Sequence, residues 1–321
     1  MDLPWQEELK TSINNNHDLL TTLGLPTNNL DSKFKLKAPL SFVAKMQPNN
    51  PQDPLLLQVL IQQQENLIST DYSNDPLAEK KSNPAQGVIH KYNNRALIIL
   101  AGGCAINCRY CFRRHFEYSK NQTNLDTSSA AYQYLKTNKS ISEVILSGGD
   151  PLLHHDDKIQ QIINNLEAIQ HIKTIRIHTR LPIVIPNRIT SKFVSILKKC
   201  QLNIVIVTHC NHPQELDANT KNAFAKLINA NITIFNQTVL LKNINDSADI
   251  LIKLSHKLFA QKIIPYYIHA LDAVQGSQHF AKDINEIINL ETALKTELPG
   301  YLVPKFVKDG INQKFKLPIA K

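Results

Sequence analysis

Three cysteines stand close together in the run GGCAINCRYC, directly after an apolar segment typical of a β-strand. Cys104, Cys108 and Cys111 have the spacing C-x3-C-x2-C. Thiolates are the usual ligands of iron–sulfur clusters, and a cubane [4Fe–4S] cluster needs four of them to fill all its corners. Three thiolates therefore leave one iron open to bind another molecule. A zinc site or three buried thiols are the alternatives, but zinc prefers paired C-x2-C knuckles and no second knuckle follows.

Polar residues recur where other apolar, β-branched segments end. The turn Gly148-Gly149-Asp150 follows one segment, His178-Thr179-Arg180 the next, and His209-Cys210-Asn211-His212 the one after. Gln237 lies within a later segment, and Asp272 lies beyond the last one. The loops after the strands of a parallel α/β barrel form one active site, so we expect a single pocket to contain these residues. Two adjacent glycines also let the backbone approach a ligand closely, although a plain turn is the alternative.

The elements that must position these residues alternate between strand and helix patterns from about residue 89 to residue 280. We expect strands at 96–101, 144–147, 174–178, 204–208, 233–239 and 263–268, and helices at 128–137, 158–170, 191–200, 219–229 and 247–261. Strands separated by helices predict an α/β fold with a parallel sheet and right-handed crossovers. Spacing alone leaves both a doubly wound sheet and a partial barrel open.

Two regions flank this 89–280 core. Residues 1–88 are predicted to be an N-terminal accessory helical region, with helical spacing over 5–23 and a second helix over about 54–68. Residues 281–321 are predicted to be a C-terminal segment that completes the site.

The composition is typical of a cytoplasmic enzyme. A chain of 321 residues that is 42% hydrophobic can bury a full core. Five cysteines, three of them clustered, suit a reducing compartment rather than a disulfide scaffold. The start, MDLPWQEE, lacks the pattern of a signal peptide, and no apolar run approaches the ~20 residues of a membrane span. The net charge is +9, but the basic residues are scattered, so we expect no nucleic-acid or membrane partner.

The cysteine spacing resembles the signature of radical S-adenosylmethionine (SAM) enzymes. Other segments are similar to the lysine 2,3-aminomutases within that superfamily, and most similar to their short elongation factor P β-lysylation branch (EpmB). These segments are CFRRHF at 111–116, LSGGD at 146–150, IHTRLP at 177–182, QTVLLK at 237–242 and PYYI at 265–268. The resemblance runs from about residue 91 to the C-terminus. It implies a radical SAM partial (β/α)6 barrel with a short C-terminal segment carrying the pyridoxal phosphate (PLP) lysine.

The resemblance implies three cofactors and the residues that hold them. Cys104, Cys108 and Cys111 would ligate a [4Fe–4S] cluster, and Gly148, Gly149 and Asp150 would contact SAM. PLP would form a Schiff base with Lys316, which stands before Leu317-Pro318 as the family pattern requires. Lys305 and Lys314 are the competing lysines. Arg95 and Gln237 align near the PLP phosphate.

Three further residues imply the substrate. Asp272 and Asp309 align with the carboxylates that hold the distal ammonium of lysine, and Arg113 aligns with the arginine that clamps the α-carboxylate. Charge supports this assignment, because a desolvated ammonium needs nearby anions and a planar guanidinium fits a carboxylate. The implied enzyme is an isomerase that converts L-lysine to β-lysine through a 5′-deoxyadenosyl radical. It would need an external electron donor and would have a functional link to elongation factor P.

Several alternatives remain at this stage. Glutamate or arginine could replace lysine as the substrate of an aminomutase. A PLP-free radical SAM enzyme acting on RNA would use the positive net charge as its electrostatic footprint. A non-catalytic cluster or scaffold protein would carry the same cysteines without cleaving SAM.

Overall fold

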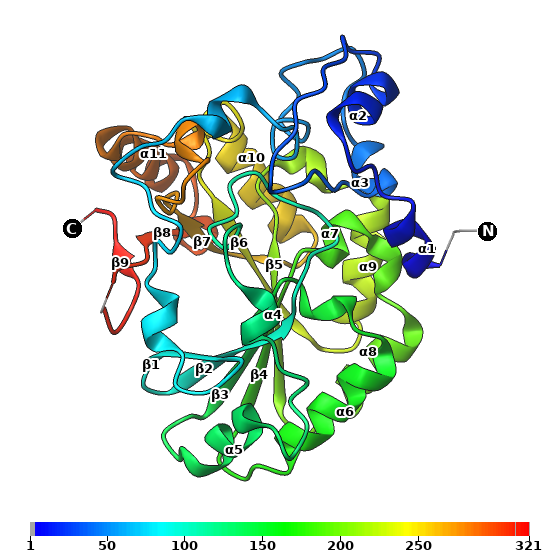
Figure 1. Cartoon of the computed structure of the whole chain (residues 1–321), viewed down its shortest axis with the longest axis vertical. Helices are drawn as coiled ribbons and strands as arrows, with labels where there is room; N and C mark the ends of the chain where they lie inside the picture. Colours follow the sequence, from blue (N-terminus) through cyan, green and yellow to red (C-terminus); the bar gives the residue numbers. More distant parts are fainter. Residues whose placement is uncertain (1–3, 312, 321) are drawn as a thin grey trace.

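A computed structural model describes residues 4–311 and 313–320 of the chain. Within these residues, nine strands form one sheet, and each strand pairs with its neighbours in sequence order (Figure 1). Strands β2 to β8 are parallel, whereas the edge strands β1 and β9 run antiparallel to their partners. The strands are β1 Val88–Tyr92, β2 Arg95–Ala101, β3 Glu143–Gly148, β4 Thr174–Thr179, β5 Asn203–His209, β6 Thr233–Val239, β7 Ile264–His269, β8 Lys305–Lys308 and β9 Leu317–Pro318.

The predicted partial barrel is confirmed. The sheet is curved but open, with β1 at one edge of the order and β9 at the other. All six predicted strands are present as β2 to β7, and each predicted boundary lies within one residue of the observed one. Strands β1, β8 and β9 were not predicted. They extend the sheet at both edges, and β8 and β9 bring the C-terminal segment to its rim.

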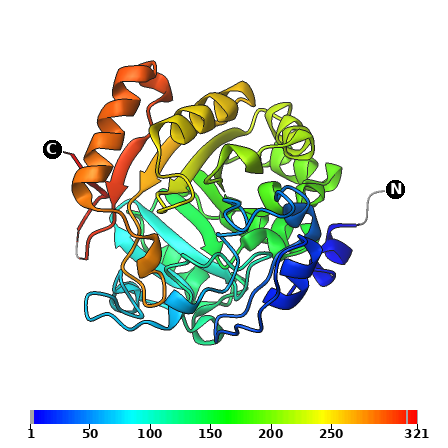
Figure 2. The same ribbon diagram turned by 90° about the horizontal axis from the view of Figure 1, so that it is seen from above.

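Helices cover the convex face of the sheet, as the view from above shows (Figure 2). Side chains at their N-termini explain where several begin: Ser129, Thr190, Asp217 and Ser247 each accept a hydrogen bond from a backbone amide of the first turn. The helices of this layer are α5 Ala130–Thr137, α6 Asp156–Glu167, α7 Leu181–Val184, α8 Ser191–Lys199, α9 Ala218–Ile228, α10 Ala248–Ala260 and α11 Ile284–Glu297.

Side chains of the strands alternate between the core and the inside of the barrel, as the two-residue period of a strand requires. In β3, Val144 and Leu146 are fully buried in the main hydrophobic core, whereas Ile145 and Ser147 line the internal cavity. In β4, Arg176 and His178 line that cavity. This alternation aims polar side chains inward while the opposite face packs against the helices.

The N-terminal region packs onto the same hydrophobic core as the barrel, and its contribution includes Leu19, Leu36, Phe42 and Leu55. Its described residues, 4–88, contain three short α-helices and two 3-10 helices, and the remaining short elements follow later in the chain. They are α1 Trp5–Lys10, α2 Asn16–Thr22, α3 Leu40–Val43, α4 Tyr118–Asn121, and the 3-10 helices η1 Gln63–Asn66, η2 Glu79–Ser82, η3 Pro151–Leu153, η4 Pro186–Arg188, η5 Pro213–Glu215, η6 Gln278–Phe280 and η7 Gly300–Leu302.

The helix predicted over 54–68 is wrong. Turns occupy residues 54–59, and the only helical part of the segment is the single 3-10 turn η1. Its backbone groups are used in tertiary contacts instead: the carbonyl of Gln58 accepts from the Arg109 amide at 2.9 Å, and the Ile61 amide donates to the Asn16 side chain at 3.0 Å. Apolar spacing predicted a regular helix because these long-range partners leave no local signal.

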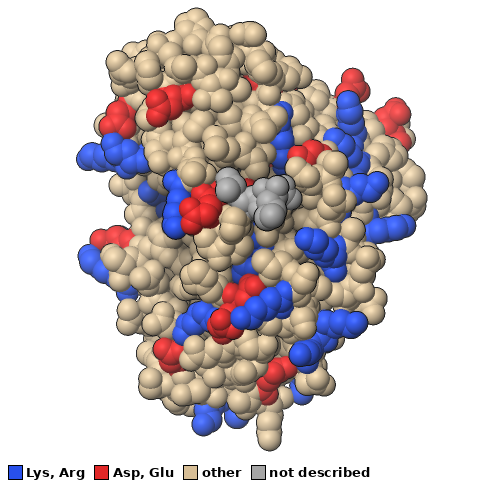
Figure 3. Space-filling model, turned by 90° about the vertical axis from the view of Figure 1, so that its right-hand side faces the viewer, with Lys and Arg blue, Asp and Glu red and all other residues tan. Residues whose placement is uncertain are grey.

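On the face drawn in Figure 3, Lys and Arg side chains are interspersed with Asp and Glu. No helix in residues 4–311 or 313–320 is long and apolar enough to cross a membrane.

Candidate active site

A cavity of about 480 Å³ lies inside the curve of the sheet and is lined by residues from the ends of its strands. All twelve residues predicted for the site line this one cavity. They are Arg95, Cys104, Cys108, Cys111, Arg113, Gly148, Gly149, Asp150, Gln237, Asp272, Asp309 and Lys316. The residues come from segments more than 200 positions apart, so the fold gathers them rather than any local motif.

The cysteine loop follows β2 and is braced by the N-terminal region. The Asn107 amide donates to the carbonyl of Lys37 at 3.0 Å, and the Lys37 ammonium donates to the carbonyl of Cys104 at 3.2 Å. Behind the loop, the fully buried Arg109 forms a bidentate pair with Glu65. These contacts fix the loop from outside while the three thiols face the cavity.

The three thiols fit a cluster better than a single ion. Within the described part of the chain, no three His, Cys, Asp or Glu side chains are arranged to hold one metal ion. In a cubane cluster each thiolate binds a different iron, so the thiols need not converge on one point. Burial, together with the nearby Cys108, raises the pKa of Cys111 to about 11, and burial raises the pKa of Cys104 well above its usual range. Cluster assembly must therefore displace protons from these thiols.

The glycine turn after β3 lies directly against the cysteine loop. A Cβ atom on Gly149 would stand 1.8 Å from the carbonyl oxygen of Gly103, and Gly148 has a φ of +115°, which side-chain-bearing residues rarely adopt. The Asp150 amide donates to the same Gly103 carbonyl at 2.8 Å. Glycine is therefore required here by close approach, and the backbone of two cavity-lining loops meets at this point.

The Asp150 side chain also makes contacts within the chain. Its carboxylate accepts from the Thr179 hydroxyl at 2.8 Å and from the amides of Leu152, Arg180 and Leu181 at 2.7 to 3.2 Å. It thus joins the end of β3 to the end of β4. The predicted SAM contact of Asp150 remains a prediction.

Lys316 reaches the cavity from β8 and β9, and its ammonium forms an ion pair with Asp309. The other oxygen of Asp309 accepts from the Tyr92 hydroxyl at 2.9 Å. The competing lysines are placed differently, since Lys305 and Lys314 are exposed and do not line this cavity. Lys316 is therefore the lysine of the three that faces the cysteines across the shared space.

Electrostatics separate the two acids of this corner. Burial and the nearby Asp309 charge raise the pKa of Asp272 to about 7. Burial also opposes ionisation of Asp309, but the Lys316 ammonium and further partners outweigh it and lower the pKa of Asp309. Burial and Lys316 lower the pKa of His269 to about 3, so the imidazole is neutral. Since Lys316 already pairs with Asp309, Asp272 is the acid that lacks a cationic partner in an ion pair among the described residues.

Arg113 is buried, and its guanidinium forms a bidentate pair with the carboxylate of Glu79. Its Nε and Nη2 atoms donate to the two oxygens of Glu79, each at 2.7 Å. The Nη1 atom makes only a long contact, 3.4 Å, with the Gly148 carbonyl. Glu79 therefore orients the guanidinium, and the Nη1 edge is left with spare donor capacity at the cavity wall.

The predicted phosphate-binding residues lie in the same cavity. Arg95 stacks on the Tyr92 ring, with its guanidinium carbon 4.3 Å from the ring centroid, and among the described residues its side chain donates only to the exposed Asn94 side chain. Nearby in the sheet, Gln237 pairs in register with Tyr267 of β7. The buried Nε2 atom of His178 has no hydrogen-bond partner in the part of the chain that the structure describes, as expected of a cavity built to hold a polar molecule.

Sequence reasoning missed several cavity residues. Glu79 and Tyr92 come from the N-terminal region and from unpredicted β1, and Arg176 lies in the middle of β4. None belongs to a motif. The alternation of β4 could have identified Arg176, because it shares a face with His178. Glu79 had no comparable signal, since its partner Arg113 is 34 positions away.

Comparison with known proteins identifies the family. The family model described as the radical SAM superfamily matches residues 98–254. The L-lysine 2,3-aminomutase of Haemophilus influenzae is 44% identical over 95% of this chain and 92% of its own length. Those of Buchnera aphidicola and Escherichia coli are 45% and 46% identical, over 98% and 89% of this chain and 95% and 83% of their own lengths. The chain therefore belongs to the lysine 2,3-aminomutase family, as its motifs predicted.

Proposed function

We propose that this protein is an isomerase, a radical SAM and PLP-dependent 2,3-aminomutase that converts L-lysine to β-lysine. One observation supports the proposal above all: the three clustered thiols and Lys316 line the same cavity of about 480 Å³. The family uses a [4Fe–4S] cluster, SAM and PLP together, and such chemistry requires the cluster-bound and the lysine-bound groups to face each other. A cavity lined by the three cysteines without Lys316, or by Lys316 without the cysteines, could not support this reaction.

In this proposal the cofactors supply the radical and the electron-delocalising ring, and the protein supplies position and charge. The three thiolates, each directed into the cavity, hold the cluster. Gly148, Gly149 and Asp150, which line the cavity beside the cysteine loop, contact SAM. Lys316 holds PLP through its amine, and Arg95 and Gln237 bind the phosphate end. The half-buried setting of Lys316 limits competing reaction with water.

The substrate assignment follows from charge. Lys316 neutralises Asp309 while its amine is free. Once that amine is engaged elsewhere, Asp309 and Asp272 form a pair of buried anions, and a substrate ammonium is the cation that satisfies both. Glutamate would add a third anion to this corner and is therefore disfavoured. The Nη1 edge of Arg113, oriented by Glu79, is proposed to receive the α-carboxylate.

The proposed reaction also implies a use for its product, an electron donor and a cellular location. We propose that the β-lysine made here serves the modification of elongation factor P, whose ligation would be another enzyme's step. The cluster needs an external one-electron donor. Because clustered free thiols and an iron–sulfur cluster both require reducing conditions, the proposed location is the cytoplasm.

The test is anaerobic reconstitution with iron, sulfide, SAM and PLP, followed by incubation with L-lysine, L-glutamate or L-arginine and analysis of the products. The proposal predicts β-lysine from lysine and no β-amino acid from the other two. β-Glutamate or β-arginine as the main product would change the substrate. SAM cleavage without any pyridoxal absorbance would favour a PLP-free enzyme, and a stable cluster that never cleaves SAM would favour a scaffold.

A further inference from the structure

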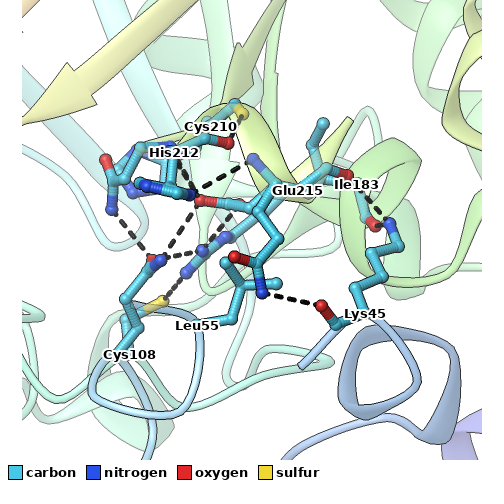
Figure 4. A network of polar contacts seen from close by, with 12 residues as sticks. Lys45, Leu55, Cys108, Ile183, Cys210, His212 and Glu215 are labelled. Carbon is cyan, nitrogen blue, oxygen red and sulfur yellow. Dashed lines mark hydrogen bonds and ion pairs between the residues drawn. The ribbon is translucent and has the colours of Figure 1, made fainter. Parts of the chain in front are cut away.

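Arg180, directly after β4, reaches from the barrel to the cysteine loop. Its side chain is 7% exposed, and its Nη1 atom donates to the Cys108 sulfur at 2.7 Å and to the Tyr110 hydroxyl at 2.8 Å. Its Nη2 atom donates to Glu215 at 2.9 Å and to the Gln58 side-chain oxygen at 2.6 Å. One guanidinium therefore bridges a cysteine of the loop and a buried carboxylate; Figure 4 shows this network with Cys108 and Glu215 labelled.

Glu215 is held so firmly that it fixes the position of Arg180. The residue is fully buried, and the carboxylate oxygen that does not face Arg180 accepts from the amides of Asn211 at 2.9 Å and His212 at 3.0 Å. The same oxygen accepts from the Gln58 amide group at 3.2 Å. Because two backbone amides hold the Glu215 carboxylate in place, this carboxylate holds the Arg180 guanidinium in one orientation, with Nη1 toward the Cys108 sulfur.

Comparison with another buried arginine indicates that the sulfur contact is specific. Arg188 is also fully buried; it forms an ion pair with Asp156 and donates to the backbone carbonyls of Leu152 and His154. All of these partners are ordinary protein groups, as in a structural arginine. Arg180 differs because one of its donors is directed at a thiol that lines the cavity and belongs to the cluster motif.

We infer that Arg180 is a positioning residue that raises the reduction potential of the cluster, and that Glu215 limits this effect. The inference rests on the proposed function, because it requires a cluster on Cys108. Reduction adds one negative charge to the cluster, and hydrogen bonds to its sulfurs are among the factors that set its potential. A permanently charged donor against a ligand sulfur favours the reduced form. A buried anion behind that donor opposes it.

The test is a redox titration of the full-length, cluster-loaded protein without lysine or PLP, with the reduced cluster followed by electron paramagnetic resonance. Arg180→Gln should lower the equilibrium constant for one-electron reduction at least tenfold, equivalent to a potential about 59 mV more negative. Glu215→Gln, which removes the opposing charge and keeps the shape, should shift the potential in the positive direction. Arg188→Gln is the matched buried control and should leave the potential unchanged.

Opposite shifts for the two variants distinguish tuning from damage, because a merely structural role would move both in the same direction or neither. An unshifted potential in Arg180→Gln with a full iron content overturns the inference. If that variant does not retain iron, Glu215→Gln decides, and an unchanged or more negative potential there is equally decisive against it. Failure of the wild-type protein to assemble any cluster would instead sink the proposed function.

Discussion

If Asp272 binds the distal ammonium of lysine, the affinity for lysine should depend on pH and should fall when Asp272 is substituted. Because burial and Asp309 raise the pKa of Asp272 to about 7, this carboxyl is neutral below that pH and charged above it. Only the charged form attracts an ammonium strongly. At a pKa of about 7, roughly a tenth of the carboxyl is ionised at pH 6 and about nine tenths at pH 8. The affinity for lysine should therefore rise about tenfold across this range.

Asp272→Asn removes both the charge and its titration while keeping the size of the side chain. A hydrogen bond to a charged group contributes about 1.5–3 kcal/mol, which corresponds to an increase in KM for lysine of about 10- to 150-fold at pH 8. The variant should also lose most of the pH dependence between 6 and 8. The increase should be smaller at pH 6, where the wild-type carboxyl is itself largely neutral.

The assay is anaerobic turnover of lysine at several pH values, with norleucine as a competing analogue that has hydrogen in place of the ε-ammonium. The inhibition constant of norleucine should be insensitive to Asp272→Asn. Asp157→Asn is the surface control, since the Asp157 side chain is 84% exposed and forms an ion pair with Lys192 on the surface. The ammonium assignment is refuted if Asp272→Asn leaves the KM for lysine and its pH dependence as in the wild type.

Three further predictions follow from the site. Gly149→Ala places a Cβ 1.8 Å from the Gly103 carbonyl, so it should destabilise the fold by about 1–3 kcal/mol and abolish SAM cleavage, both measurable by thermal unfolding and product analysis. Arg113→Gln leaves Glu79 buried and unpaired and should cost about 3–5 kcal/mol of unfolding free energy, partly restored in the double variant with Glu79→Gln. Lys316→Ala should load its cluster normally but should not be labelled covalently by PLP after borohydride reduction; a labelled variant would place the Schiff base elsewhere.

The strands β2 to β7 and the longer helices between them could be predicted from the sequence, because β-branched runs and amphipathic spacing are local patterns. Their boundaries follow from strand length and from caps such as Ser247. The sequence was also sufficient to predict one cavity for the residues that follow the strands, whereas Arg95, Asp309 and Lys316 were expected there only from the family resemblance. Parallel strands place their carboxyl ends together, so residues that follow successive strands must meet.

The sequence did not predict the contacts that hold the site. The bond from Arg180 to Cys108, the pairing of Arg113 with Glu79 and the bracing of the cysteine loop by Lys37 all join residues far apart in the chain. Such pairs leave no periodicity. The N-terminal region was hardest for the same reason, because its turns are fixed by long-range hydrogen bonds instead of by helical propensity.

The central claim is that a cluster on Cys104, Cys108 and Cys111 and a PLP group on Lys316 act on one molecule in one cavity. Deuterium transfer tests it most directly. With L-lysine deuterated at its β-carbon, the account predicts deuterium in the 5′-deoxyadenosyl group recovered from the anaerobic reaction and in the β-lysine product. Deoxyadenosine free of deuterium, formed while lysine remains unchanged, would contradict the account.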